Sequence, residues 1–141
     1  METLQYIISM ILPGLFTALG LVHFYWAVGG TKGLAGSIPE KDGGPLFSPT
    51  FGITSTLAMG LFVCTALVLD FSGRIILPLQ PHLVRWGLLA ILALFLGRMI
   101  GDFNYMGIFK KVKGTLFATR DDKIYSPLSG LIALMIAILL R

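Results

Sequence analysis

The sequence predicts an all-α membrane protein with four transmembrane helices, and three observations support this prediction. Hydrophobic residues make up 55% of the 141 residues and charged residues only 13%, whereas a soluble domain has about a quarter charged residues. The mean hydropathy is +0.84. The apolar residues gather in four runs, each able to cross a hydrocarbon layer about 30 Å thick. We therefore predict one domain over residues 1–141, with spans near 4–28, 51–69, 83–101 and 125–140.

The first span, residues 4–28, has no charged residue between Glu2 and Lys32. It lacks the basic start and small-residue cleavage site of a signal peptide, so we expect it to be retained. Tyr25 and Trp26 near its end suit the headgroup boundary, because their rings are apolar and their polar atoms can stay hydrated. His23 shares a helical face with Trp26, and because no second histidine is placed to join it, a polar network is favoured over a metal ligand.

Residues 31–50 form a loop in this interpretation, because they contain four glycines and three prolines that exclude a continuous helix. We expect this loop to lie over one end of the helices. A loop of this length is often a lid or a binding segment, with disorder as the alternative.

Stripes of small residues mark the second and third spans. Gly52, Thr56, Gly60 and Cys64 are each four residues apart, as are Ala93, Gly97 and Gly101. Such stripes let helix backbones approach closely in lipid. We expect these faces to contact each other or a second subunit, which predicts a possible homo-oligomer.

Residues 102–123 form the longest polar connection. Apolar residues at 105, 108, 109, 112 and 116 recur at helical spacing with lysines between them, which predicts a short amphipathic helix at the membrane surface. Lys110, Lys111 and Lys113 are expected to meet lipid headgroups. Ser126 and Pro127 suit the first turn of the fourth span.

Basic residues are distributed unequally between the two ends of the predicted helices. One end has eight of them and the other has only Arg74, Arg85 and Arg141. Because basic loops stay in the cytoplasm, both termini are expected outside the bacterial cytoplasmic membrane. The net charge of +4 fits an anionic lipid surface better than nucleic acid, which is not expected as a partner.

No cofactor or metal site is expected. Cys64 is the only cysteine, which excludes an internal disulfide and a cysteine-built metal site. His23 and His82 lie at opposite ends of the predicted helices, about 30 Å apart, too far to share a metal. No nucleotide fingerprint or nucleophile elbow is present.

The end of the third span combines charge with close-packing glycines. Arg98 and Asp102 lie four residues apart on one helical face and can pair. If the first and third spans touch, the cytoplasmic end gathers a candidate ligand-binding pocket of seven residues: His23, Tyr25, Trp26, Arg98, Asp102, Tyr105 and Tyr125. Such a pocket could hold a polar-headed amphiphile, with Arg98 facing an anionic group. The alternative is that Arg98 and Asp102 form a purely structural pair.

Five motifs in order resemble an uncharacterised family of small four-span bacterial membrane proteins. They are His23-Phe24-Tyr25-Trp26-Ala27-Val28-Gly29-Gly30, Gly101-Asp102-Phe103, Gly107-Ile108-Phe109-Lys110-Lys111, Phe117-Ala118 and Tyr125-Ser126-Pro127-Leu128. The resemblance covers nearly the whole chain. It implies the fold and a bacterial membrane location, and it implies no activity.

Three function classes follow from these observations. The first is a protein that binds, or acts on, a lipid-like amphiphile in the candidate pocket. The second is a membrane adaptor or assembly factor without catalysis. The third, a small dimeric transporter, is less favoured because proton-coupled transport needs an acidic residue deep in a span, and Asp70 and Asp102 both lie at predicted span ends.

Overall fold

The computed structural model describes residues 2–141, and within them four helices are long and apolar enough to cross a membrane. They are α1 (Thr3–Ala27), α2 (Phe51–Phe71), α3 (Pro81–Ile100) and a last helix that runs from Leu116 to Leu139. The last helix consists of α4 (Leu116–Arg120), a π-helical turn η2 (Asp121–Tyr125) and α5 (Ser126–Leu139). The predicted all-α fold class with four spans is confirmed.

Side chains at the starts of the helices explain where three of them begin. Thr50 caps α2 by accepting a hydrogen bond from the Ile53 N–H, and Thr115 caps α4 by accepting one from the Ala118 N–H. Pro81 occupies the first turn of α3, where its missing N–H costs nothing.

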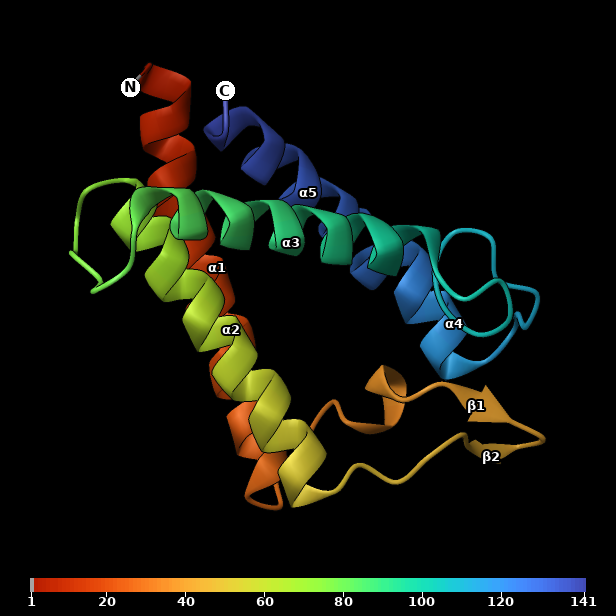
Figure 1. Ribbon diagram of the computed structural model, residues 1–141. Helices are drawn as coiled ribbons and strands as arrows, with labels where there is room; N and C mark the ends of the chain where they lie inside the picture. Colours follow the sequence, from red (N-terminus) through yellow and green to blue (C-terminus); the bar gives the residue numbers. More distant parts are fainter. Residues whose placement is uncertain (1) are drawn as a thin grey trace.

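The helices form two antiparallel pairs that cross. Figure 1 shows α1 and α2 side by side along their length, with α3 crossing the upper part of this pair at a steep angle and α5 returning beside α3. The two ends of the chain lie near each other at the top of this view. The two pairs therefore meet along only part of their length.

The core lies where the two pairs cross. Leu12, Phe16, Leu88, Ile132 and Ile136 are completely buried there. By contrast, α2 and α3 expose many large apolar side chains, which suits helices surrounded by lipid.

Close helix contacts occur at three glycines outside the predicted stripes. A Cβ on Gly20, Gly87 or Gly130 would lie under 3.0 Å from a side chain of a neighbouring helix. Gly52, Gly60 and Gly97 have no such neighbour within 4 Å. The prediction that the two small-residue stripes contact each other within the chain is therefore wrong, and contact with a second subunit stays a prediction.

Residues 101–115 contain no helix, so the predicted amphipathic helix over 105–116 is wrong. The reason lies in the backbone, because Gly101, Phe103, Gly107 and Gly114 all have positive φ. At Gly101 a Cβ would lie 1.8 Å from the Met106 carbonyl oxygen. The chain crosses itself here, which only glycine permits.

The fourth helix begins at Leu116, nine residues before the predicted start of the fourth span. The charged run over residues 120–123 is predicted to be part of the polar connection between the third and fourth spans. Instead it forms the end of α4 and the π-helical turn η2, and Asp121 within it is fully buried.

The segment between α1 and α2 is folded. It contains the 3₁₀ turn η1 (Ala35–Ser37) and a small hairpin of β1 (Glu40–Lys41) and β2 (Gly44–Pro45), which pair antiparallel. Asp42 and Gly43 both have positive φ, as a two-residue hairpin turn of type I′ requires. Figure 1 shows this segment reaching beneath α4.

Candidate functional site

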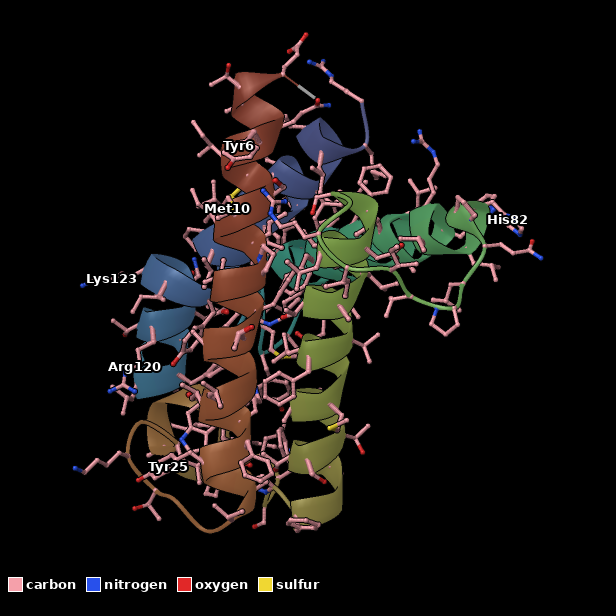
Figure 2. All side chains as sticks on the ribbon, turned by 90° about the vertical axis from the view of Figure 1, so that its left-hand side faces the viewer. Tyr6, Met10, Tyr25, His82, Arg120 and Lys123 are labelled. Atoms are coloured by element: carbon pink, nitrogen blue, oxygen red, sulfur yellow. The ribbon has the colours of Figure 1, made fainter. Side chains whose placement is uncertain are left out.

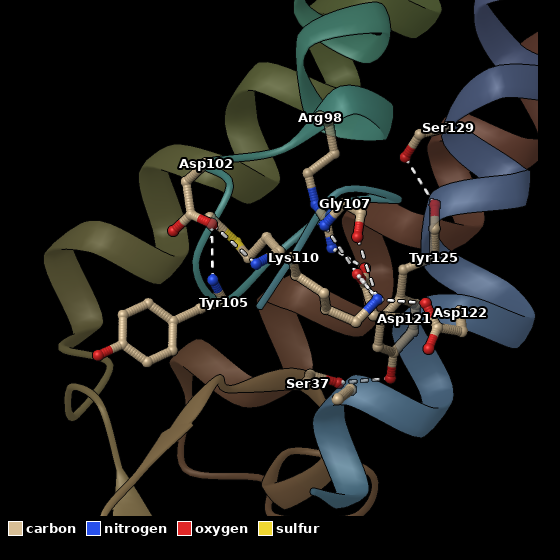
Figure 3. Close-up of polar contacts among 12 residues, drawn as sticks. Ser37, Arg98, Asp102, Tyr105, Gly107, Lys110, Asp121, Asp122, Tyr125 and Ser129 are labelled. Carbon is tan, nitrogen blue, oxygen red and sulfur yellow. Dashed lines mark hydrogen bonds and ion pairs between the residues drawn. The ribbon is translucent and has the colours of Figure 1, made fainter. Parts of the chain in front are cut away.

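The side chain of Asp121 is the centre of a buried charged cluster near the start of the last helix (Figure 3). It is completely buried. One carboxylate oxygen accepts a hydrogen bond from Arg98 Nη2 at 2.7 Å, and the other accepts from the Gly107 N–H at 2.8 Å and from Lys110 Nζ at 3.1 Å. Asp121 thus joins α3, the following loop and the last helix.

Lys110 is also part of this cluster. Its side chain is completely buried, and its Nζ additionally donates to the Gly107 carbonyl at 3.1 Å and pairs with Asp122. Burial works against the ammonium charge, but the hydrogen bonds and charges of Asp122 and Asp121 outweigh it and raise the pKa of Lys110. The prediction that Lys110 meets lipid headgroups is therefore wrong, whereas Lys111 and Lys113 are exposed.

The cluster is electrically balanced, since Arg98 and Lys110 face Asp121 and Asp122. A buried pair of this kind is stabilised most when its remaining donors and acceptors are satisfied, whereas Arg98 Nη1 is buried and has no hydrogen-bond partner among the described residues. The π-helical turn contributes to this arrangement, because it widens the helix at the residue where Asp121 turns inward. The cluster fastens the 101–115 loop to the last helix.

Arg98 pairs with Asp121 and not with Asp102, so the predicted pair is wrong. Asp102 follows the end of α3 and accepts hydrogen bonds from the N–H groups of Asn104, Tyr105 and Met106 at 3.0, 2.7 and 2.9 Å. Partial desolvation opposes ionisation, but these backbone donors outweigh it and lower the pKa of Asp102. Asp102 therefore organises the start of the loop.

The three predicted site residues of α1 form a separate group near its end. His23 Nδ1 donates to the Leu19 carbonyl at 2.8 Å, and its ring contacts Trp26 edge-on. Trp26 Nε1 donates to the Lys32 carbonyl at 2.9 Å, and Tyr25 accepts a hydrogen bond from the Lys32 N–H at 3.4 Å. Trp26 and Tyr25 therefore fix the start of the 31–50 segment at the end of α1.

Tyr125 holds the middle of the same segment. Its hydroxyl donates to the Gly36 carbonyl at 3.0 Å and lies 3.1 Å from Ser37 Oγ. Two more contacts join the segment to α4: Arg120 donates to the Gly33 carbonyl, and the Phe117 N–H donates to Glu40. The segment is therefore packed onto the last helix.

The seven predicted pocket residues thus fall into separate groups, each around a loop. Tyr25, Trp26 and Tyr125 hold the 31–50 segment, and His23 contacts Leu19 and Trp26 within α1. Arg98 and Asp102 hold the 101–115 loop, in which Tyr105 is half-buried. The contacts of residues 2–141 do not join them into one pocket.

The loop between α1 and α2 forms a groove of its own against the start of α4. The groove has a volume of about 490 Å³. It is lined by Thr31, Leu34, Ala35, Ile38, Glu40, Gly43, Gly44, Pro45 and Leu116. Sequence reasoning missed these lining residues; the only signal was the length of the loop and its glycines and prolines.

A polar contact at the other end of α1 was also missed. Arg74 donates to the Ser9 hydroxyl at 2.9 Å, and its guanidinium lies 5.3 Å from the centre of the Tyr6 ring. His82 lies in this half of the molecule, and Figure 2 shows it at the far end from Tyr25.

A second groove, of about 520 Å³, lies between the end of α2 and the start of α3 and includes His82 and Arg85.

Comparison with known families matches residues 16–136 to the family described as "Protein of unknown function (DUF3995)". Comparisons with curated proteins and with solved structures found no match.

Proposed function

The chain belongs to this family of unknown function, and we propose that it binds a polar-headed amphiphile in the groove between residues 31–45 and Leu116. The observation that carries this proposal is the groove itself. Its volume of about 490 Å³ falls within the range of about 300–1,000 Å³ that is usual for small-molecule sites.

The lining of the groove suits a molecule with an apolar part and a polar head. Leu34, Ile38, Pro45 and Leu116 offer apolar surface for a hydrocarbon chain, and Glu40 offers a carboxylate. The segment is fastened to the last helix by Tyr125, so the groove is formed in advance. A preformed site loses less conformational entropy when a ligand binds.

We propose that this groove faces the cytoplasm in a bacterial inner membrane. The eight basic residues gathered at this end of the helices support that orientation. The proposed function is binding and not turnover, because the charged groups nearest the loops are occupied in holding them: Arg98 and Lys110 with Asp121, and Asp102 with backbone N–H groups.

Native mass spectrometry of protein extracted together with its lipids tests the proposal. Ala35 is exposed in the groove, so Ala35→Trp should fill it and reduce the co-purified amphiphile severalfold. Ala93→Trp, at an exposed position of α3, is the matched control and should retain the amphiphile. Equal retention by both variants, or no retained molecule in the wild type, would contradict the proposal.

A membrane adaptor is the second candidate function. The observation in its favour is the open face of α2, where Gly52 and Gly60 have no neighbour within 4 Å and Leu57 is 53% exposed. Such a face lets another helix approach closely. Stoichiometric cross-linking of one partner through a cysteine placed at Gly60, and not through one placed at Met10, would favour this function over amphiphile binding.

A further inference from the structure

The 101–115 loop displays an exposed aromatic and basic surface that consists of Phe103, Ile108, Phe109, Lys111 and Lys113. The three apolar side chains are 56%, 51% and 58% exposed, respectively. The rings of Phe103 and Phe109 stack with their centres 6.2 Å apart. Two stacked phenylalanines on a polar loop are unusual, because burying such rings normally stabilises a protein.

The backbone of the loop fixes this surface, although Phe103 must adopt a strained conformation. Phe103 has a φ of +62°, a strained conformation that a bulky residue rarely adopts. Asp102 offsets this strain with its three hydrogen bonds to the next N–H groups. The Asn104 carbonyl also accepts from the N–H groups of Lys111 and Val112, at 3.0 and 2.9 Å. The two phenylalanines are therefore presented outward by a fixed loop.

The charges of the loop identify what this surface faces. Lys110 is neutralised inside the cluster by Asp121 and Asp122. Lys111 and Lys113 remain exposed, with Asp102 as the single exposed acidic residue of the loop. The exposed part is therefore net positive, which suits an anionic surface.

The position of the loop next to the end of α3 also suits contact with the membrane surface. Phe103 comes three residues after Ile100, the last residue of α3, and three residues span at most about 10 Å. The aromatic rings must therefore lie close to the end of a membrane span. Phenylalanines at this depth can enter the boundary between headgroups and acyl chains.

From these observations we infer that the 101–115 loop is a preformed anchor for anionic lipid, with Phe103 and Phe109 inserted below the headgroups and Lys111 and Lys113 on their phosphates. This anchor is independent of the groove beside residues 31–45. It concerns lipid of the surrounding bilayer and needs no ligand in that groove.

Spin labelling of the full chain in proteoliposomes tests the anchor. In a Cys64→Ala background, Ile108→Cys carries the label between the two phenylalanines, and Asp42→Cys carries it at the tip of the exposed hairpin. Vesicles consist of phosphatidylcholine alone or mixed with phosphatidylglycerol. We expect a severalfold higher ratio of oxygen to nickel-complex accessibility at 108 than at 42, and a further increase with phosphatidylglycerol.

Two further variants separate the contributions. Lys111→Gln with Lys113→Gln should remove the phosphatidylglycerol dependence and leave the difference between 108 and 42. Asp102→Ala should reduce the accessibility ratio at 108, because the turn that presents Phe103 loses the side-chain oxygen that accepts its three hydrogen bonds. A label at 108 as accessible to the nickel complex as the label at 42 would overturn the inference. Dipolar broadening between labels at 108 would overturn it in favour of a contact between two copies of the chain.

Discussion

Asp121 accepts hydrogen bonds from Arg98 of α3 and from Lys110 and the Gly107 N–H of the following loop. Because its side chain is completely buried, no water can replace a lost partner. Removing one charge of such a cluster leaves the opposite charges buried without compensation. The stability of this end of the molecule therefore depends on a single carboxylate.

We predict that Asp121→Asn lowers the free energy of unfolding by about 3–5 kcal/mol. Asp122→Asn is the control and should cost less, because the Asp122 side chain is 54% exposed and Lys110 keeps Asp121 as its partner. Both values can be measured by SDS titration in mixed micelles. Similar losses in the two variants would contradict the role given to Asp121.

Asp102 gives the start of the loop a pH dependence. Its pKa lies below the ordinary value of 3.8, so its hydrogen bonds stabilise the folded loop above that value and are lost as the pH falls through the lowered pKa. The amide proton shifts of Asn104, Tyr105 and Met106 should therefore titrate together below pH 3.8. In Asp102→Asn this common titration should vanish; if it persists, another group is responsible.

The sequence identified the right residues at this end of the molecule but assigned them the wrong partners. Arg98 and Asp102 are four residues apart, a spacing that suggests a pair only while the helix continues. The helix ends at Ile100, so Asp102 turns to the backbone and Arg98 reaches Asp121, 23 residues away. Nothing local in the sequence indicates a contact over that separation.

At the scale of elements, the positive φ of Gly107 allows the 101–115 loop to cross the end of α3. A Cβ on Gly107 would lie 2.3 Å from the Ile100 carbonyl oxygen. Gly114 also has a positive φ, but a Cβ there meets nothing within 4 Å. An alanine at Gly114 would therefore be strained only by its positive φ, whereas an alanine at Gly107 would in addition collide with the backbone of α3.

We predict that Gly114→Ala costs about 1–2 kcal/mol from the strained φ alone. Gly107→Ala should cost more, because the Ile100 carbonyl must move and the hydrogen bond from Gly107 to Asp121 is disturbed. Trypsin cleavage after Lys111 and Lys113 reports release of the loop and should accelerate only in Gly107→Ala. Equal cleavage in both variants would show that the crossing is unimportant.

The helices could be predicted because a long apolar run in lipid has few alternatives to a helix. The 101–115 loop could not be predicted. Residues 105–116 have helical periodicity, but positive φ at Gly101, Phe103 and Gly107 excludes a helix. Those φ values are set by contacts with α3 and Asp121. The same contacts explain why the charged residues 120–123 lie within the last helix, since burial of Asp121 depends on cations from elsewhere in the chain.

At the scale of the whole molecule, Tyr125 connects the first loop to the last helix. Tyr125→Phe removes the hydrogen bond to the Gly36 carbonyl and should cost about 1 kcal/mol. Hydrogen exchange of residues 33–38 should accelerate. Tyr6→Phe is the control, because it keeps the ring that contacts Arg74. Unchanged exchange in Tyr125→Phe would show that the loop is held by other contacts.

The steep crossing of the two helix pairs could not be read from the sequence, although each span could. Small-residue stripes on the second and third spans suggested that these faces meet. The close contacts instead lie at Gly20, Gly87 and Gly130, which face Phe62, Leu67 and Met99, respectively. A stripe of small residues indicates only that another helix can approach closely. The close contact occurs where a bulky side chain of the neighbouring helix lies opposite a glycine.

Beyond Lys32, which Tyr25 and Trp26 of α1 hold, the side-chain contacts that fasten the first loop to another helix come from residues 117–125, near the other end of the chain. During synthesis, α1 and α2 can pair as soon as both have left the ribosome, but the groove between them and α4 has no second wall until Leu116 has been made. The proposed binding site is thus completed last. A nascent chain that stops after α3 would enter the bilayer with residues 33–45 of its first loop not yet fastened to the last helix.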